Sequence, residues 1–158
     1  MSKLLLSVHV LAAILTVGPI AVAASLFPRY ARYAAPDGTD PDERVAGATV
    51  LLHRVCRTYA VVGLAVPVFG IATGAQLGVL TDAWLIASLA LTTLAAAILA
   101  LAVLPHQQRL LPLSWTAVTG DERRAVATRL AAFTGVFNLL WAIVVILMIV
   151  RPGSTTGA

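Results

Sequence analysis

The three histidines and the one cysteine of this 158-residue sequence are its main candidates for binding a metal or a metal-containing cofactor. They are His9, His53, Cys56 and His106. A neutral imidazole nitrogen and a thiolate are good ligands for zinc, copper and haem iron. One of the four stands near the start of the chain and the other three follow much later, so the sequence offers two separate candidate sites.

His9 forms the first candidate site because it lies well inside a long uncharged segment. Counted from Lys3, it lies roughly 9 Å along a helix, and ionisable groups at membrane depth are functional candidates because burying them is costly. At a similar depth we place three polar residues of later segments, Thr73, Gln76 and Ser88. Together with His9 they could line one polar pocket that holds a cofactor. The alternative is a neutral core histidine that is hydrogen-bonded to one of these side chains.

The second candidate site, called here the inner set, consists of His53, Cys56 and His106. His53 and Cys56 are three residues apart and so share one side of a helix, and we expect His106 at a similar depth. Such a set could hold zinc or copper, and its two histidines alone could hold haem iron. The alternative is that these side chains meet lipid headgroups beside neighbouring arginines.

Several other chemistries find no support in the residue pattern. The sequence contains no Ser/His/Asp arrangement, phosphate-binding loop, paired intramembrane carboxylates or twin CxxC motif. Hydrolysis and nucleotide-driven mechanisms are therefore disfavoured, and whether the chain is an enzyme stays open. The net charge of +4 does not indicate a nucleic-acid surface, because the basic residues flank apolar segments instead of alternating with aromatics.

The elements that must position these residues are membrane helices. Hydrophobic residues make up 59% of the chain and charged residues only 11%, against roughly 25% charged in soluble domains. Segments 4–28, 58–81, 83–108 and 130–150 contain no Asp, Glu, Lys or Arg, and about 20 apolar residues suffice for a helix to cross a bilayer. We predict one all-α membrane domain over residues 1–158, a bundle with spans at about 4–27, 56–80, 83–104 and 130–150.

The basic residues predict the orientation of the bundle. Arginines cluster around the predicted loops at about 28–49 and 105–129, whereas the other ends carry only Lys3 and Arg151. The positive-inside rule then places both loops in the cytoplasm and both termini outside. The second and third spans would be joined on the outside by a short hairpin at Thr81 and Asp82.

Helix packing is indicated by glycines in the second span. Gly70, Gly74 and Gly78 form two overlapping GxxxG steps, a spacing that lets a second helix approach closely, within the bundle or across a homodimer. Pro67 predicts a bend in the same helix near the middle of the membrane.

The first span also resembles a known family. Val8–Gly18, including His9, is similar to the opening helix of a bacterial membrane family called domain of unknown function 2269. That family resembles the CopD-type copper-resistance membrane domain and the HemJ-type protoporphyrinogen oxidases, in which a first-helix histidine is followed by an aromatic residue and then by glycine. Here His9 and Gly18 match this pattern, but Thr16 stands where the aromatic residue is usual.

The resemblance extends to two further segments. The segment from Val136 to Pro152 is similar to the last helix of the HemJ group. Phe27–Tyr30 resembles the Pro-Arg sequence that follows the first helix in that group. The resemblance implies a four-helix bundle, a possible dimer, in a bacterial cytoplasmic membrane, with His9 as the ligand of haem b. The HemJ group also uses a basic residue on a later helix, which only Arg54 or Arg57 could supply here from the membrane edge.

Three functions follow as hypotheses. The first is a haem-binding or redox-linked membrane protein that uses His9. The second is a binding or transport module for a metal or small molecule, at either candidate site. The third is a structural or assembly subunit of a larger membrane complex, without chemistry of its own and held by the GxxxG face.

Overall fold

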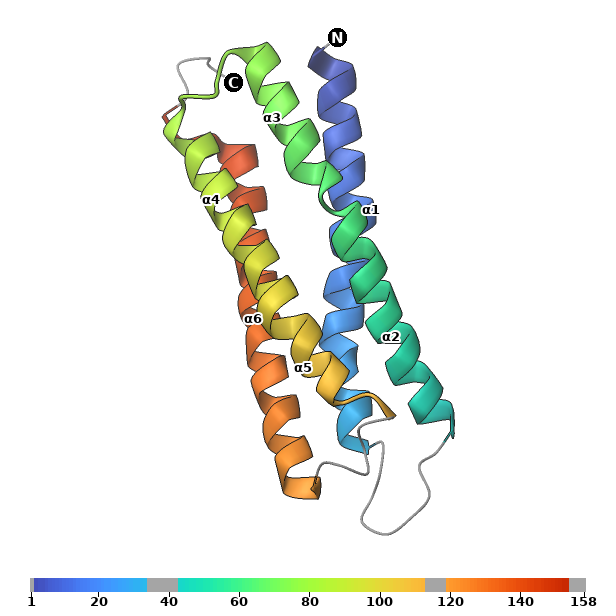
Figure 1. Cartoon of the computed structure of the whole chain (residues 1–158). Helices are drawn as coiled ribbons and strands as arrows, with labels where there is room; N and C mark the ends of the chain where they lie inside the picture. The colour runs from blue at the N-terminus through green and yellow to red at the C-terminus, as the bar shows by residue number, and fades with distance from the viewer. Residues whose placement is uncertain (1, 34–42, 113–118, 154–158) are drawn as a thin grey trace.

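The computed structural model describes residues 2–33, 43–112 and 119–153, and the regular structure in these ranges is entirely helical (Figure 1). The predicted all-α architecture is therefore confirmed. The elements are α1 (Ser2–Tyr33), α2 (Glu43–Val62), α3 (Ala65–Leu77), α4 (Ala83–Ile98), the π-helical turn η1 (Leu99–Val103), α5 (Leu104–Arg109) and α6 (Gly120–Val150).

Four helical stretches are long and apolar enough to cross a membrane, namely Lys3–Arg32, Glu43–Leu77, Ala83–Arg109 and Gly120–Val150. Many large apolar side chains on them, such as Leu101 and Ile149, are exposed on the surface of the chain, which suits a lipid environment. The four predicted spans fall on these stretches. The structure adds that helix continues into both predicted loops, because α1 ends at Tyr33, α2 begins at Glu43 and α6 begins at Gly120.

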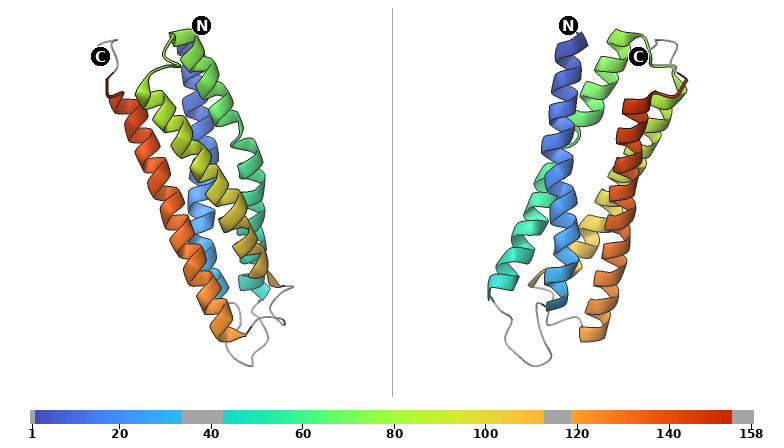
Figure 2. Two further views of the ribbon diagram at one scale, coloured as in Figure 1. Left: turned by 60° about the vertical axis from the view of Figure 1, so that its left-hand side comes forward. Right: turned by 180° about the vertical axis from the view of Figure 1, so that it is seen from behind.

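The two halves of the bundle are packed differently. The start of α1, the end of α6 and the connection between α3 and α4 lie at one end, which we call the terminal end (Figure 1). The end of α1, the start of α2, the end of α5 and the start of α6 lie at the opposite end, which we call the loop end (Figure 1). The hydrophobic core occupies the loop half, where Ala24, Phe27, Leu130 and Phe137 are buried against one another. Toward the terminal end α1 and α6 diverge (Figure 2), and this half contains the cavity described below.

Two prolines account for the interruptions in the second and third long helices. Pro67 has no N–H to donate to the carbonyl of Gly63 four residues earlier, and that carbonyl instead accepts from the Val66 N–H at 3.0 Å. The helix accordingly breaks at Gly63–Leu64, one turn before the proline that predicts the bend. Pro105 lies just after η1 and has no N–H to donate to the carbonyl of Leu101 four residues earlier, inside the π-helical turn.

The glycines of the predicted GxxxG motif have three different environments. Gly78 lies outside α3 in the left-handed conformation (φ +70°), and the Val79 N–H donates to the Gly74 carbonyl at 3.1 Å, so Gly78 ends the helix instead of extending a small-residue face. The second helix therefore stops at Leu77, before the predicted end of the span at residue 80. Gly74 packs against Leu85 of α4 and Gly70 against His9 of α1.

Candidate functional site

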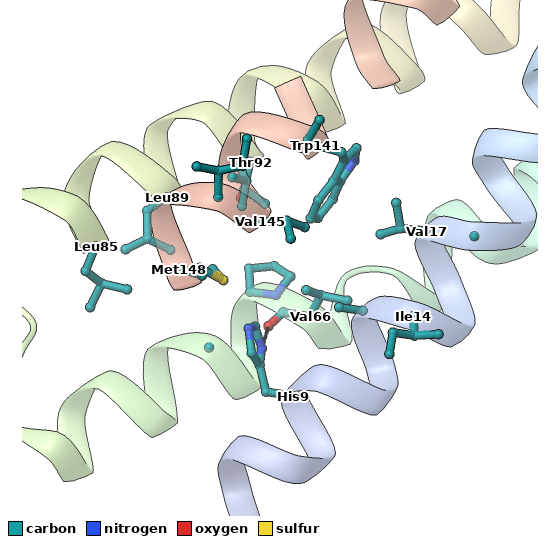
Figure 3. A pocket seen from close by; sticks show the side chains of 17 residues that line it. His9, Ile14, Val17, Val66, Leu85, Leu89, Thr92, Trp141, Val145 and Met148 are labelled. Atoms are coloured by element: carbon teal, nitrogen blue, oxygen red, sulfur yellow. Dashed lines mark hydrogen bonds between the residues drawn. The ribbon is translucent and has the colours of Figure 1, made fainter. Parts of the chain in front are cut away.

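A cavity of about 520 Å³ lies in the terminal half, between α1, α3, α4 and α6 (Figure 3). Its volume falls within the roughly 300–1,000 Å³ of typical ligand sites. The walls are mostly aliphatic, and His9, Thr92, Trp141 and Met148 are the exceptions among the described residues that line the cavity. None of the described residues that line the cavity is Asp, Glu, Lys or Arg. The arrangement suits a largely apolar ligand that is held at one or two polar points.

His9 is the main polar group of the cavity. It is only 6% exposed, and its Nδ1 lies 2.9 Å from the carbonyl oxygen of Val66 on α3 (Figure 3). A carbonyl only accepts hydrogen bonds, so Nδ1 carries the proton and donates it. In the neutral imidazole Nε2 then carries the lone pair. Nε2 has no hydrogen bond to a described residue, and it is not one of the fully buried polar atoms that lack a partner. His9 therefore presents an available ligand nitrogen to the cavity.

The hydrogen bond to Val66 matters for this role. Metal-binding histidines usually donate their other ring N–H to a carbonyl or carboxylate, which fixes the tautomer and the ring orientation. His9 has this arrangement without any metal being required to impose it. The predicted choice between a core histidine and a ligand is thus not exclusive, because one ring nitrogen is bonded within the protein and the other is available.

Gly70 makes the position of the His9 ring possible. A Cβ atom at residue 70 would lie 2.9 Å from His9 Cε1 and 3.3 Å from Nδ1, which is closer than van der Waals contact allows. The missing side chain at Gly70 leaves room for the imidazole ring, whose Cε1 atom comes nearest to α3 at this position. A residue that the sequence indicates as a helix-packing glycine thus supports the candidate ligand directly.

The structure does not bring the other three predicted pocket residues to the cavity. The hydroxyl of Thr73 donates to the Phe69 carbonyl at 2.7 Å, and that of Ser88 donates to the Trp84 carbonyl at 2.8 Å. Gln76 is exposed at the end of α3. Ser and Thr hydroxyls in helices commonly donate in this way to the backbone carbonyl four residues earlier in the same helix.

The cavity also contains Thr92, Trp141 and Met148, whose hydroxyl, aromatic and thioether side chains are not among the predicted site residues. Thr92 stands one turn after Ser88 on the same face of α4, so helical spacing from Ser88 could have indicated it. Trp141 and Met148 line the cavity from α6 (Figure 3). Nothing in the sequence marks Met148, because a single methionine in an apolar span is ordinary.

The inner set does not assemble as predicted. His53 Nδ1 lies 3.0 Å from Gln107 Oε1, and Gln107 Nε2 donates to Cys56 Sγ at 3.4 Å. His106 points elsewhere, with its Nδ1 2.7 Å from the Ala102 carbonyl and its ring 5.3 Å from that of Phe133. No group of three or more His, Cys, Asp or Glu side chains that could hold a metal occurs within the described ranges.

The π-helical turn explains why Gln107 takes the place expected for His106. In a regular helix His106 would lie about three turns after buried Ala95 and share its face. The π turn at Leu99–Val103 accommodates one additional residue and rotates the following segment. Gln107 is consequently fully buried against α2, and the adjacent Gln108 is exposed.

Polar residues of α6 pack near the middle of the bundle, beside the cavity. Asn138 Nδ2 donates to Ser25 Oγ of α1 at 3.1 Å, a hydrogen bond between two helices. Three polar side-chain atoms, Thr134 Oγ1, Asn138 Oδ1 and Trp141 Nε1, are buried and have no hydrogen-bond partner among the described residues. These atoms are enclosed by protein, so Trp141 offers the cavity its ring and not its N–H.

The fold and the cavity define a helical protein with four candidate membrane spans that surround an apolar cavity with one available imidazole nitrogen. No protein-family model, curated protein or solved structure matches the chain.

Proposed function

We propose that this chain is a multi-pass protein of a bacterial cytoplasmic membrane that binds haem b through His9 and has a haem-linked or redox role. The proposal rests on the arrangement of the two nitrogens of the His9 ring. Nδ1 is held by the Val66 carbonyl, and Nε2 faces an apolar cavity of about 520 Å³. The proposed resemblance of the first helix to the HemJ group, which has a histidine at this position, is the reason for choosing haem.

The residues present fit a porphyrin. Aliphatic walls from four helices suit its faces and edges, and Nε2 of His9 suits its iron. Met148 lines the same cavity from α6, and its thioether is a second ligand type that haem iron accepts. When bound, haem supplies reversible one-electron chemistry, whereas the protein supplies the ligand nitrogen and excludes water.

Filling the cavity should prevent haem binding. Gly18 lines the cavity, and a Cβ added there meets no atom within 4 Å, so leucine can enter this space without forcing the helices apart. We expect purified wild-type protein to show a Soret band and Gly18→Leu to lose most of it. Gly135 has equally open surroundings but does not line the cavity, and Gly135→Leu should keep its haem. Equal haem content in the two variants would place haem elsewhere.

A second candidate is a binding module for a small lipid-soluble compound other than haem. It is supported by the lack of charged side chains among the described lining residues, because haem propionates usually find basic partners. Mass spectrometry of extracts from the purified protein separates the two candidates, since only this one predicts a non-porphyrin ligand that Gly18→Leu removes.

The proposed orientation has both termini and the α3–α4 connection on the outside. It is supported by the basic residues, because all of the 11 Lys and Arg except Lys3 and Arg151 lie in or beside the two predicted cytoplasmic loops. The positive-inside rule places such loops in the cytoplasm. In a Cys56→Ser background, a membrane-impermeant maleimide should label Pro152→Cys in intact cells. Gln108→Cys should react only after lysis. The reverse labelling would invert the topology and place the cavity in the inner half of the membrane.

A further inference from the structure

The cavity is open on one side, between α1 and α6. Ile14 of α1 lines it and is nevertheless 63% exposed, as are Val145 (51%) and Ile146 (58%) of α6. The described lining residues of α3 and α4 are all buried or half-buried. Figure 2 shows α1 and α6 diverging toward the terminal end. The lining residues of α3 and α4 are thus more enclosed than those of α1 and α6, and the most exposed part of the lining lies at Ile14 on α1 and at Val145 and Ile146 on α6.

This opening faces the hydrocarbon layer if the four helices cross a membrane. Its rim consists of aliphatic side chains that lipid tails contact readily, and charged side chains are missing from the described rim residues. We infer that the occupant of the cavity is a membrane-dissolved amphiphile, which reaches His9 sideways from the surrounding lipid, between α1 and α6. The inference deepens the proposed function and rests on it only for the identity of the occupant as haem.

The polar groups of the cavity restrict the head of this amphiphile. His9 Nε2 is an acceptor as long as Nδ1 donates to Val66, so the head must offer a metal or an O–H or N–H donor. A carboxylate or phosphate head would face a lone pair and would be disfavoured. The Thr92 hydroxyl, on the opposite helix α4, adds a group that can donate or accept.

Quenching of Trp141 fluorescence by lipid tests the open side without any haem. With Trp84 and Trp115 replaced by phenylalanine, Trp141 is the only one of the three tryptophans that remains. In vesicles of lipids with brominated acyl chains, tails that enter between α1 and α6 should quench it strongly. Gly18→Leu fills that space and should reduce the quenching about twofold, since such contacts are lost over short distances. Gly135→Leu should not. Equal quenching in all three proteins would overturn the inference.

The rate of haem loading tests the same route in the wild-type background. Ile146 lies on the rim, and Ile149 is 75% exposed on the same helix but does not line the cavity. With haem supplied in vesicles, Ile146→Trp should load about tenfold more slowly with Kd changed less than about threefold, because obstruction slows entry and exit together. Ile149→Trp should load normally.

The outcomes separate the two proposals. Equal loading of Ile146→Trp and Ile149→Trp by a wild-type protein that binds haem would refute sideways entry and leave haem binding in place. A wild-type protein that binds no haem would refute the proposed cofactor, and the Trp141 quenching result would then decide whether the cavity is open to lipid.

Discussion

His9→Ala should abolish haem binding, with haem affinity reduced by at least about 100-fold, because even partners that merely orient a ligand contribute 10–100-fold. The substitution removes the nitrogen that faces the cavity. It should not impair membrane insertion, since a polar group is costly at this depth and its loss eases burial. Titration of the purified protein with haem, followed by absorption, measures the change.

Substitutions of the other two histidines serve as controls for this result. His53 is bonded to Gln107 and His106 to the Ala102 carbonyl, both outside the cavity. We expect His53→Ala and His106→Ala to leave the haem spectrum nearly intact. Loss of haem in either of them, together with full binding by His9→Ala, would place the site at the loop end of the bundle.

Gly74→Leu should strongly destabilise the bundle. Even a Cβ atom at residue 74 would lie 2.8 Å from Leu85 Cδ2 and 3.3 Å from Leu80 Cδ2, and a leucine adds three more carbons in the same direction. Overpacking of this kind costs about 1–3 kcal/mol or more, so the Tm in detergent should fall clearly. Gly135→Leu, for which the new Cβ meets nothing within 4 Å, should change the Tm little. A similar Tm for the two variants would show that α3 and α4 separate easily at this contact.

The membrane helices could be predicted from the sequence because two strong signals coincide. Charge-free apolar segments fix where helices can cross a bilayer, and lipid leaves helices as the natural solution for their backbone groups. The exact ends depend on local chemistry that segment length does not reveal. Gly78 adopts a left-handed conformation and stops α3 early, whereas α1 runs on through Pro28 to Tyr33.

The candidate site could be predicted only in part. His9 was recognised because a titratable group in an apolar helix is rare, and it does line a cavity. Its predicted partners share its depth along their helices, but depth does not say whether a hydroxyl is already bonded to its own helix, as those of Thr73 and Ser88 are. The cavity itself arises from the divergence of whole helices, and residue types do not encode that space.

The inner set shows a second reason why the sequence does not predict the site fully. Its geometry depends on one π-helical turn, which rotates the segment after Val103 and turns Gln107 inward in place of His106. A regular helix is the natural assumption for an uninterrupted apolar sequence. Pro105 is the only local signal of the defect, and a proline alone does not say whether a helix bends, breaks or takes up an extra residue.

Rescue by free imidazole tests most directly whether His9 supplies the iron ligand. His9→Gly leaves a space beside Gly70 that imidazole can occupy, with the same nitrogen available to the cavity. We predict that His9→Gly protein purified without imidazole carries no haem. Adding haem and imidazole together should then restore the wild-type absorption spectrum, whereas haem alone should not. Haem binding by His9→Gly that is as tight without imidazole as with it, and spectrally identical to wild type, would contradict a role of His9 as ligand.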